Sequence, residues 1–94
     1  MTISIVVLDK GFVSVGVLSN SEDRTGWHCL DNACVVRRWG TTAGLGQLAM
    51  EGPQSQTMLD KTTRQSFPEH SIVKVIDCDE DKWAKVLGVK KEKK

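Results

Sequence analysis

Short apolar runs separated by polar turn residues recur along the chain, and they predict β-strands. The first run covers residues 3–8, where Ile3, Ile5, Val6, Val7 and Leu8 are β-branched or apolar. Residues 9–11 supply turn chemistry before a second run over residues 12–18, so the two segments predict a hairpin. Residues 19–26 are polar without an apolar period, which is typical of a loop.

The next two predicted strands lie on either side of Asp31 and Asn32. One begins at Trp27 and the other covers residues 34–39. We expect a turn between them, because Asp and Asn side chains bond to nearby backbone groups. Further along, residues 54–61 predict a loop and residues 71–76 predict a strand. Residues 62–67 predict another strand, which Pro68 restricts to an edge or an end of the sheet.

A short helix is expected after Gly40, with Thr41 or Thr42 as its N-terminal cap and Gly52-Pro53 as its end. Leu45, Leu48 and Ala49 follow a helical period. Two internal glycines weaken this helix by about 1 kcal/mol each relative to alanine. Packing onto the sheet must therefore hold it, through Leu45, Leu48 and Met50.

A second short helix is predicted to run through Leu87. Asp79 is its expected cap, and Gly88 is its expected stop. Capping also accounts for the acidic run at residues 77–81, since acidic side chains in the first turn favour the helix dipole. The apolar stripe that docks this helix consists of Trp83, Ala84, Val86 and Leu87.

Five or six short strands with two minor helices predict a mainly β fold in a single domain over residues 1–88. The expected architecture is a small Sm-like or SH3-like barrel, or a strongly bent antiparallel sheet. With 94 residues the chain has room for one hydrophobic core, so oligomerisation would add stability.

Charge and cysteine content limit the kinds of partner and the cellular compartment that we expect for this chain. The last residues, 89–94, hold four lysines and predict a basic disordered tail, and without it nine basic and eleven acidic residues remain. That balance argues against duplex DNA as a partner, because phosphate neutralisation supplies much of DNA affinity. Three cysteines without a secretory signal indicate reduced thiols in a cytoplasm. The apolar start is too short to span a bilayer, so we expect no membrane association.

The densest chemical signal is the segment 37–46. Arg37 and Arg38 are permanent cations, Trp39 offers a large π face, and a helix start follows. Such a segment can hold an anionic or nucleotide-like ligand through backbone N–H groups, arginine and stacking. Thr57 and Asp60, in the predicted loop, are secondary candidates. The candidate ligand residues are therefore Arg37, Arg38, Trp39, Gly40, Thr41, Thr42, Gly44, Thr57 and Asp60.

A structural interpretation of the same segment stays open. In it Trp39 belongs to the core, the two arginines straddle the sheet as solvated or ion-paired residues, and the glycines permit a tight turn. Successive strand residues point to opposite faces, so Arg37 and Arg38 can line one surface only if a bulge intervenes.

Catalytic and metal chemistry find little support in the sequence. His28, Cys29, Cys34 and Cys78 are residue types that zinc accepts, yet their spacing fits no known zinc motif. Cys29 and Cys78 are expected to be buried, inert thiols, and nothing indicates an activated nucleophile. We therefore expect no enzyme activity, no metal and no cofactor.

Two resemblances add to this interpretation. The order of Gly11, a Val-rich strand containing Gly16, an acidic loop and residues 30–33 is similar to the first motif of Sm-like barrels, which implies a ring-forming habit. A wider resemblance spans most of residues 5–83 and links the chain to a family of small uncharacterised phage and prophage proteins. Its motifs are residues 8–13, 37–42, 44–46, 52–53 and 57–60. This family implies a viral origin and a role in the host cytoplasm.

Two functions follow as expectations. The first is a non-enzymatic, oligomeric binding protein for a nucleotide-like or other anionic small ligand, acting as a counter-defence sponge for a host immune signal. The alternative is a phage inhibitor that contacts a host protein complex, or a minor virion or assembly component.

Overall fold

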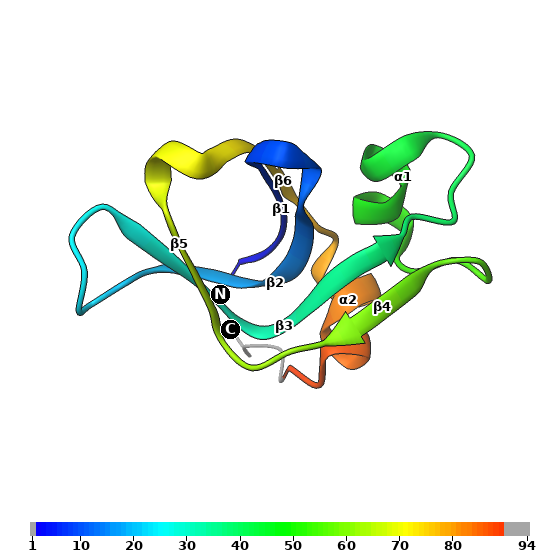
Figure 1. Ribbon diagram of the computed structural model, residues 1–94. Helices are drawn as coiled ribbons and strands as arrows, with labels where there is room; N and C mark the ends of the chain where they lie inside the picture. The colour runs from blue at the N-terminus through cyan, green and yellow to red at the C-terminus, as the bar shows by residue number, and fades with distance from the viewer. Residues whose placement is uncertain (1, 90–94) are drawn as a thin grey trace.

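The sheet of this protein is built around β3 (Trp27–Arg38), a strand of 12 residues. The computed structural model describes residues 2–89 and confirms the predicted mainly β class. Within those residues six antiparallel strands form one sheet, accompanied by two α-helices and two 3₁₀ turns (Figure 1). The remaining elements are β1 (Ile3–Leu8), η1 (Asp9–Gly11), β2 (Val13–Asn20), α1 (Gly44–Glu51), β4 (Met58–Lys61), β5 (Gln65–Pro68), η2 (Glu69–Ser71), β6 (Ile72–Asp77) and α2 (Glu80–Leu87).

The sheet is strongly bent, as one of the two predicted architectures required. Its strand order is β4-β3-β2-β1-β6, and β5 pairs with the other half of β3. Trp27 lies opposite Pro68 in β5, whereas Cys34 lies opposite Lys61 in β4. From β5 the chain returns through η2 to β6, which pairs with β1 (Figure 1). The long strand β3 thus pairs with β5 through its first half and with β4 through its second half.

The predicted turn at Asp31 and Asn32 is wrong, because β3 runs through it. Asn32 has a φ of 51°, and the register with β2 shifts by one residue there, which marks a β-bulge. Opposite the bulge, a Cβ on Gly16 would lie 2.8 Å from the carbonyl oxygen of Asp31. Glycine therefore makes room for the bulge, and Asn tolerates its left-handed backbone.

The predicted loop at residues 54–61 is also wrong in its second half, where β4 forms. Three of the four residues of β4 are exposed and only Leu59 is partly buried, so no apolar alternation marks it as a strand. Backbone pairing with β3 creates this strand instead. The other strands match their predictions to within a few residues.

The two helices differ in how well the sequence describes them. Asp79 caps α2 by accepting the N–H groups of Asp81 and Lys82, and Gly88 ends it, as predicted. For α1 the predicted threonine cap is wrong, since the helix begins at Gly44 and Ala43 provides no side-chain cap. The predicted packing of Met50 on the sheet is wrong, since Met50 is 64% exposed, whereas Leu48 and Ala49 are buried.

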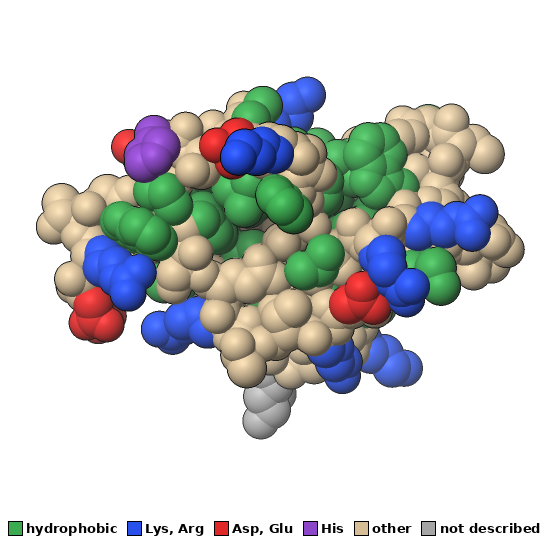
Figure 2. Space-filling model, viewed as in Figure 1, with side chains coloured by type: hydrophobic (Ala, Val, Ile, Leu, Met, Phe, Trp, Pro, Cys, Tyr) green, Lys and Arg blue, Asp and Glu red, His purple; other side chains and the backbone are tan. Residues whose placement is uncertain are grey.

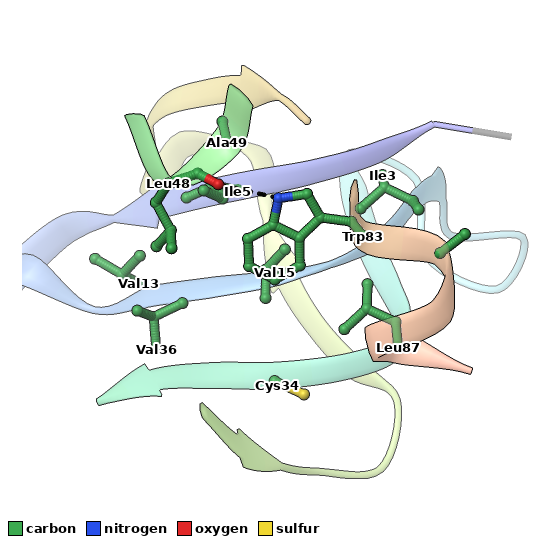
Figure 3. Close-up of a cluster of buried hydrophobic side chains, with 11 residues drawn as sticks. Ile3, Ile5, Val13, Val15, Cys34, Val36, Leu48, Ala49, Trp83 and Leu87 are labelled. Atoms are coloured by element: carbon green, nitrogen blue, oxygen red, sulfur yellow. Dashed lines mark hydrogen bonds between the residues drawn. The ribbon is translucent and has the colours of Figure 1, made fainter. Parts of the chain in front are cut away.

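The core lies on both faces of the sheet. The larger cluster packs α1 and α2 against the strands, with Trp83 and Leu48 fully buried at its centre (Figure 3). A smaller cluster around Leu30 and Phe67 lies on the other side of β1. Val86 does not belong to the predicted stripe, because it is 40% exposed. Val89 of the predicted tail packs against the larger cluster, and residues 90–94 lie outside the described part of the chain.

Candidate functional site

The segment 37–46 forms a corner that connects β3 to α1. Gly40 has a φ of 67°, and a Cβ there would lie 2.3 Å from the backbone of Gln56 and Thr57. The hydroxyl of Thr57 donates to the carbonyl oxygen of Trp39 at 2.6 Å and accepts the N–H of Gln54 at 2.8 Å. Thr57 thus secures the corner to the turn that precedes β4. Gly40 and Thr57 thus shape the backbone of the corner in this structure.

The backbone N–H groups before α1 already have an internal acceptor. Gln47 Oε1 accepts from the N–H of Thr42 at 3.1 Å and from the N–H of Ala43 at 2.7 Å. The Thr42 hydroxyl donates to the same oxygen, and the Thr41 hydroxyl donates to the carbonyl oxygen of Gly44. The side chain of Gln47, which the sequence did not single out, therefore occupies the position that an anion would take at this helix start.

The two arginines are placed differently. A register shift between β3 and β4 puts a bulge at Arg37. The Nε of Arg37 lies 3.0 Å from a carboxylate oxygen of Asp60, and both side chains are about half exposed. Two predicted ligand residues are thus an ion pair. Arg38 is exposed and lies opposite Met58 in the register.

Trp39 is not a core residue, since 43% of its surface is exposed. It forms part of the wall of a largely apolar cleft of about 400 Å³ between α1 and the β1–β2–β6 region. Figure 2 shows hydrophobic side chains at the surface between η1 and α1. The lining residues are Val7, Gly11, Val13, Trp39, Leu45, Gly46, Val73, Lys74 and Ile76.

Lys74 is the only charged residue among those that line this cleft within the described chain. It lies opposite Val7 in the pairing of β1 with β6. A surface of this composition suits a flat, apolar ring that stacks on Trp39 and carries a negative group toward the ammonium of Lys74. Of the predicted segment, the cleft uses Trp39, Leu45 and Gly46.

A second hollow, of about 290 Å³, is polar and lies near the loop after β2. Its two arginines already have partners. Arg64 donates to both carboxylate oxygens of Asp31, at 2.6 and 3.2 Å, and the guanidinium of Arg24 lies 4.9 Å from the ring centre of Trp27. The acidic residues Glu22 and Asp23 also line this hollow, so it suits an anionic, partly apolar ligand less well than the Trp39 cleft does.

The thiols are unsuited to nucleophilic chemistry. Burial raises the pKa of Cys34, and it raises the pKa of Cys78 to about 12. Both remain protonated near neutral pH, and the thiolate is the reactive form. Cys29 is buried 3.6 Å from the hydroxyl of Ser66. His28 Nε2 lies 3.3 Å from a carboxylate oxygen of Glu69, and no three metal-ligating side chains gather anywhere in residues 2–89.

Comparisons with known proteins give no family. No family model matches the chain, and no curated protein matches its sequence. Within residues 2–89 neither helix has the length and apolar composition needed to cross a bilayer. The candidate site therefore rests on the geometry of the cleft.

Proposed function

We propose that this protein is a non-enzymatic binding protein that captures a small, nucleotide-like ligand in the Trp39 cleft. The exposed indole of Trp39 on the wall of an apolar hollow carries this proposal. Stacking of a base on an aromatic side chain contributes about 1–3 kcal/mol and tolerates different bases. A cleft of about 400 Å³ is also within the usual size range of small-molecule sites.

Charge supports an anionic ligand. The ammonium of Lys74 faces no acidic residue among those that line the cleft. A phosphate or carboxylate group on the ligand would provide that counter-charge. Neither Cys34 nor Cys78, whose pKa values are raised, lines the cleft. The site therefore offers binding contacts and no activated nucleophile.

The resemblance of the sequence to small phage proteins supports a proposed biological role. We place the protein in the cytoplasm of an infected host, where it would sequester a nucleotide signal of host immunity. Such a sponge needs only affinity and abundance, because bound ligand is withdrawn without turnover. The Sm-like order of features supports oligomerisation of the binding domain, which would multiply the sites in each particle.

Thermal unfolding against a panel of mononucleotides, cyclic nucleotides and cyclic dinucleotides tests the proposal. A ligand at 100 times its dissociation constant stabilises the folded state by about 2.7 kcal/mol. We expect at least one member to raise the Tm of the wild type, and neither Trp39→Ala nor Lys74→Met to respond. The control is Trp27→Phe, because Trp27 lies outside the cleft. A panel without effect, or an unchanged response in Trp39→Ala, would refute the assignment.

A further inference from the structure

Strand β6 is an edge of the sheet. Among residues 2–89 it pairs on one side only, with β1. The N–H of Cys78 donates to the carbonyl oxygen of Ile3 at 2.8 Å, which makes these two residues a hydrogen-bonded pair. Such pairs alternate along an antiparallel ladder, so Lys74 and Ile76 also direct their backbone groups toward β1. The N–H and C=O groups of the alternate residues point away from β1.

The outward groups belong to Val75 and Asp77. The side chains beside them are apolar and accessible, since Val73 is 67% and Val75 is 40% exposed. Unpaired backbone groups next to exposed β-branched side chains are a template for one more strand. Neither Val75 nor Asp77 lines the Trp39 cleft, whereas Val73 and Lys74 do, so this edge adjoins the cleft without being part of it.

The charges on β6 argue against a second copy of the same chain. Lys74 and Asp77 are both exposed, and they lie on opposite faces of the strand. In a two-fold antiparallel pairing through the outward groups, even-numbered residues meet even-numbered ones. Lys74 would then face isoleucine, cysteine or another Lys74, and Asp77 would face valine or another Asp77. No register of that kind pairs opposite charges.

We propose that β6 captures an extended segment of another protein as an additional antiparallel strand. The complementary segment carries an acidic residue opposite Lys74 and a basic residue opposite Asp77. Opposite Val75 and Ile76 it carries apolar, β-branched residues. Read from its N-terminus, the partner therefore has the pattern basic, apolar, apolar, acidic. Opposite charges in cross-strand positions favour this partner over sequences that lack them.

Two capped octapeptides of equal composition test the pattern. One is Thr-Thr-Lys-Val-Val-Glu-Thr-Thr, and the other exchanges its Lys and Glu. In an NMR titration we expect the first to bind at least about threefold more tightly, because it alone aligns both charges in the antiparallel direction. Bound peptide should also slow hydrogen exchange at the N–H of Val75 and of Asp77.

A proline tests the edge itself. Val75→Pro removes an N–H that points away from β1 and so should leave the ladder between β1 and β6 intact. We expect it to abolish peptide binding, whereas Val75→Thr, which keeps the N–H, should bind as the wild type does. Circular dichroism establishes that both variants are folded.

Several results would overturn the proposal. They are equal affinity for the two peptides, tighter binding of the exchanged peptide, no binding of either, or binding that survives in folded Val75→Pro. Light scattering that shows a dimer of the wild type but not of Val75→Pro would assign the edge to a second copy instead. Failure of the nucleotide panel remains distinguishable from these outcomes, because the panel tests Trp39, which lies outside β6, whereas Lys74 belongs to both surfaces.

Discussion

The indole N–H of Trp83 donates a hydrogen bond of 3.1 Å to the carbonyl oxygen of Leu48, and both side chains are fully buried (Figure 3). The bond joins α2 to α1. Close by, the carbonyl oxygen of Ala49 accepts the N–H of Asp79 at 2.9 Å. The C-terminal half of α1 is thus held to the core, while its first turn supplies Leu45 and Gly46 to the cleft. Core packing therefore positions one wall of the candidate site.

Replacement of Trp83 by Phe should destabilise the fold. The variant loses the hydrogen bond from the indole N–H and leaves part of the core empty, which together should lower the free energy of unfolding by about 2 kcal/mol. Urea denaturation followed by circular dichroism measures the change. Trp39→Phe is the matched control, and its effect should stay within about 0.5 kcal/mol because Trp39 is exposed. Equal losses in the two variants would contradict the core role of Trp83.

Gly40→Ala should disrupt the corner that carries Trp39. The added Cβ meets the backbone of residues 56 and 57, and the positive φ strains any L-residue, so a loss of about 2 kcal/mol or more is expected. Gly46→Ala is the comparison, since nothing lies within 4 Å of its Cβ position. That variant should gain up to about 1 kcal/mol of helix stability. Thermal unfolding distinguishes them, and similar Tm shifts would contradict the steric argument.

The cap of α2 predicts a graded effect. Asp79→Ala removes an acceptor of two N–H groups and should lower stability by about 1 kcal/mol. Asp79→Asn keeps a capping oxygen and should recover most of that loss. Denaturant unfolding of the pair measures both values. If Asn were as harmful as Ala, the carboxylate charge rather than the cap would be the important contribution.

The raised pKa of the Cys78 thiol makes stability depend on alkaline pH. Its pKa is about 12 in the folded protein, above the ordinary value of 9.0. The contribution is therefore complete below pH 9 and is lost as the pH rises from 9 toward 12, because only the unfolded thiol ionises in that range. Unfolding of wild type and Cys78→Ala across pH 8–11 tests this, and the wild type should show the steeper decline. Parallel pH profiles would refute it.

Much of the fold could be predicted from local pattern. In the strand at residues 3–8 every side chain except that of Ser4 is β-branched or apolar, and the capped helix begins after Asp79 and ends before Gly88. These features are visible in the sequence because each depends on neighbouring residues. The bulge at Asn32 and the strand β4 escaped prediction, since both depend on backbone pairing with a distant strand.

The candidate site likewise has some features that the sequence reveals and others that depend on the tertiary structure. By itself the sequence determined the mainly β class and drew attention to Trp39 through the density of charged, aromatic and glycine residues around it. Only the tertiary structure decided that Arg37 is paired with Asp60, and that Gln47 occupies the N–H groups before α1. It also brought Lys74 of β6 to the same cleft as Trp39. No local signal could show this, because the cleft forms where strands from the two ends of the chain pair and α1 packs beside them.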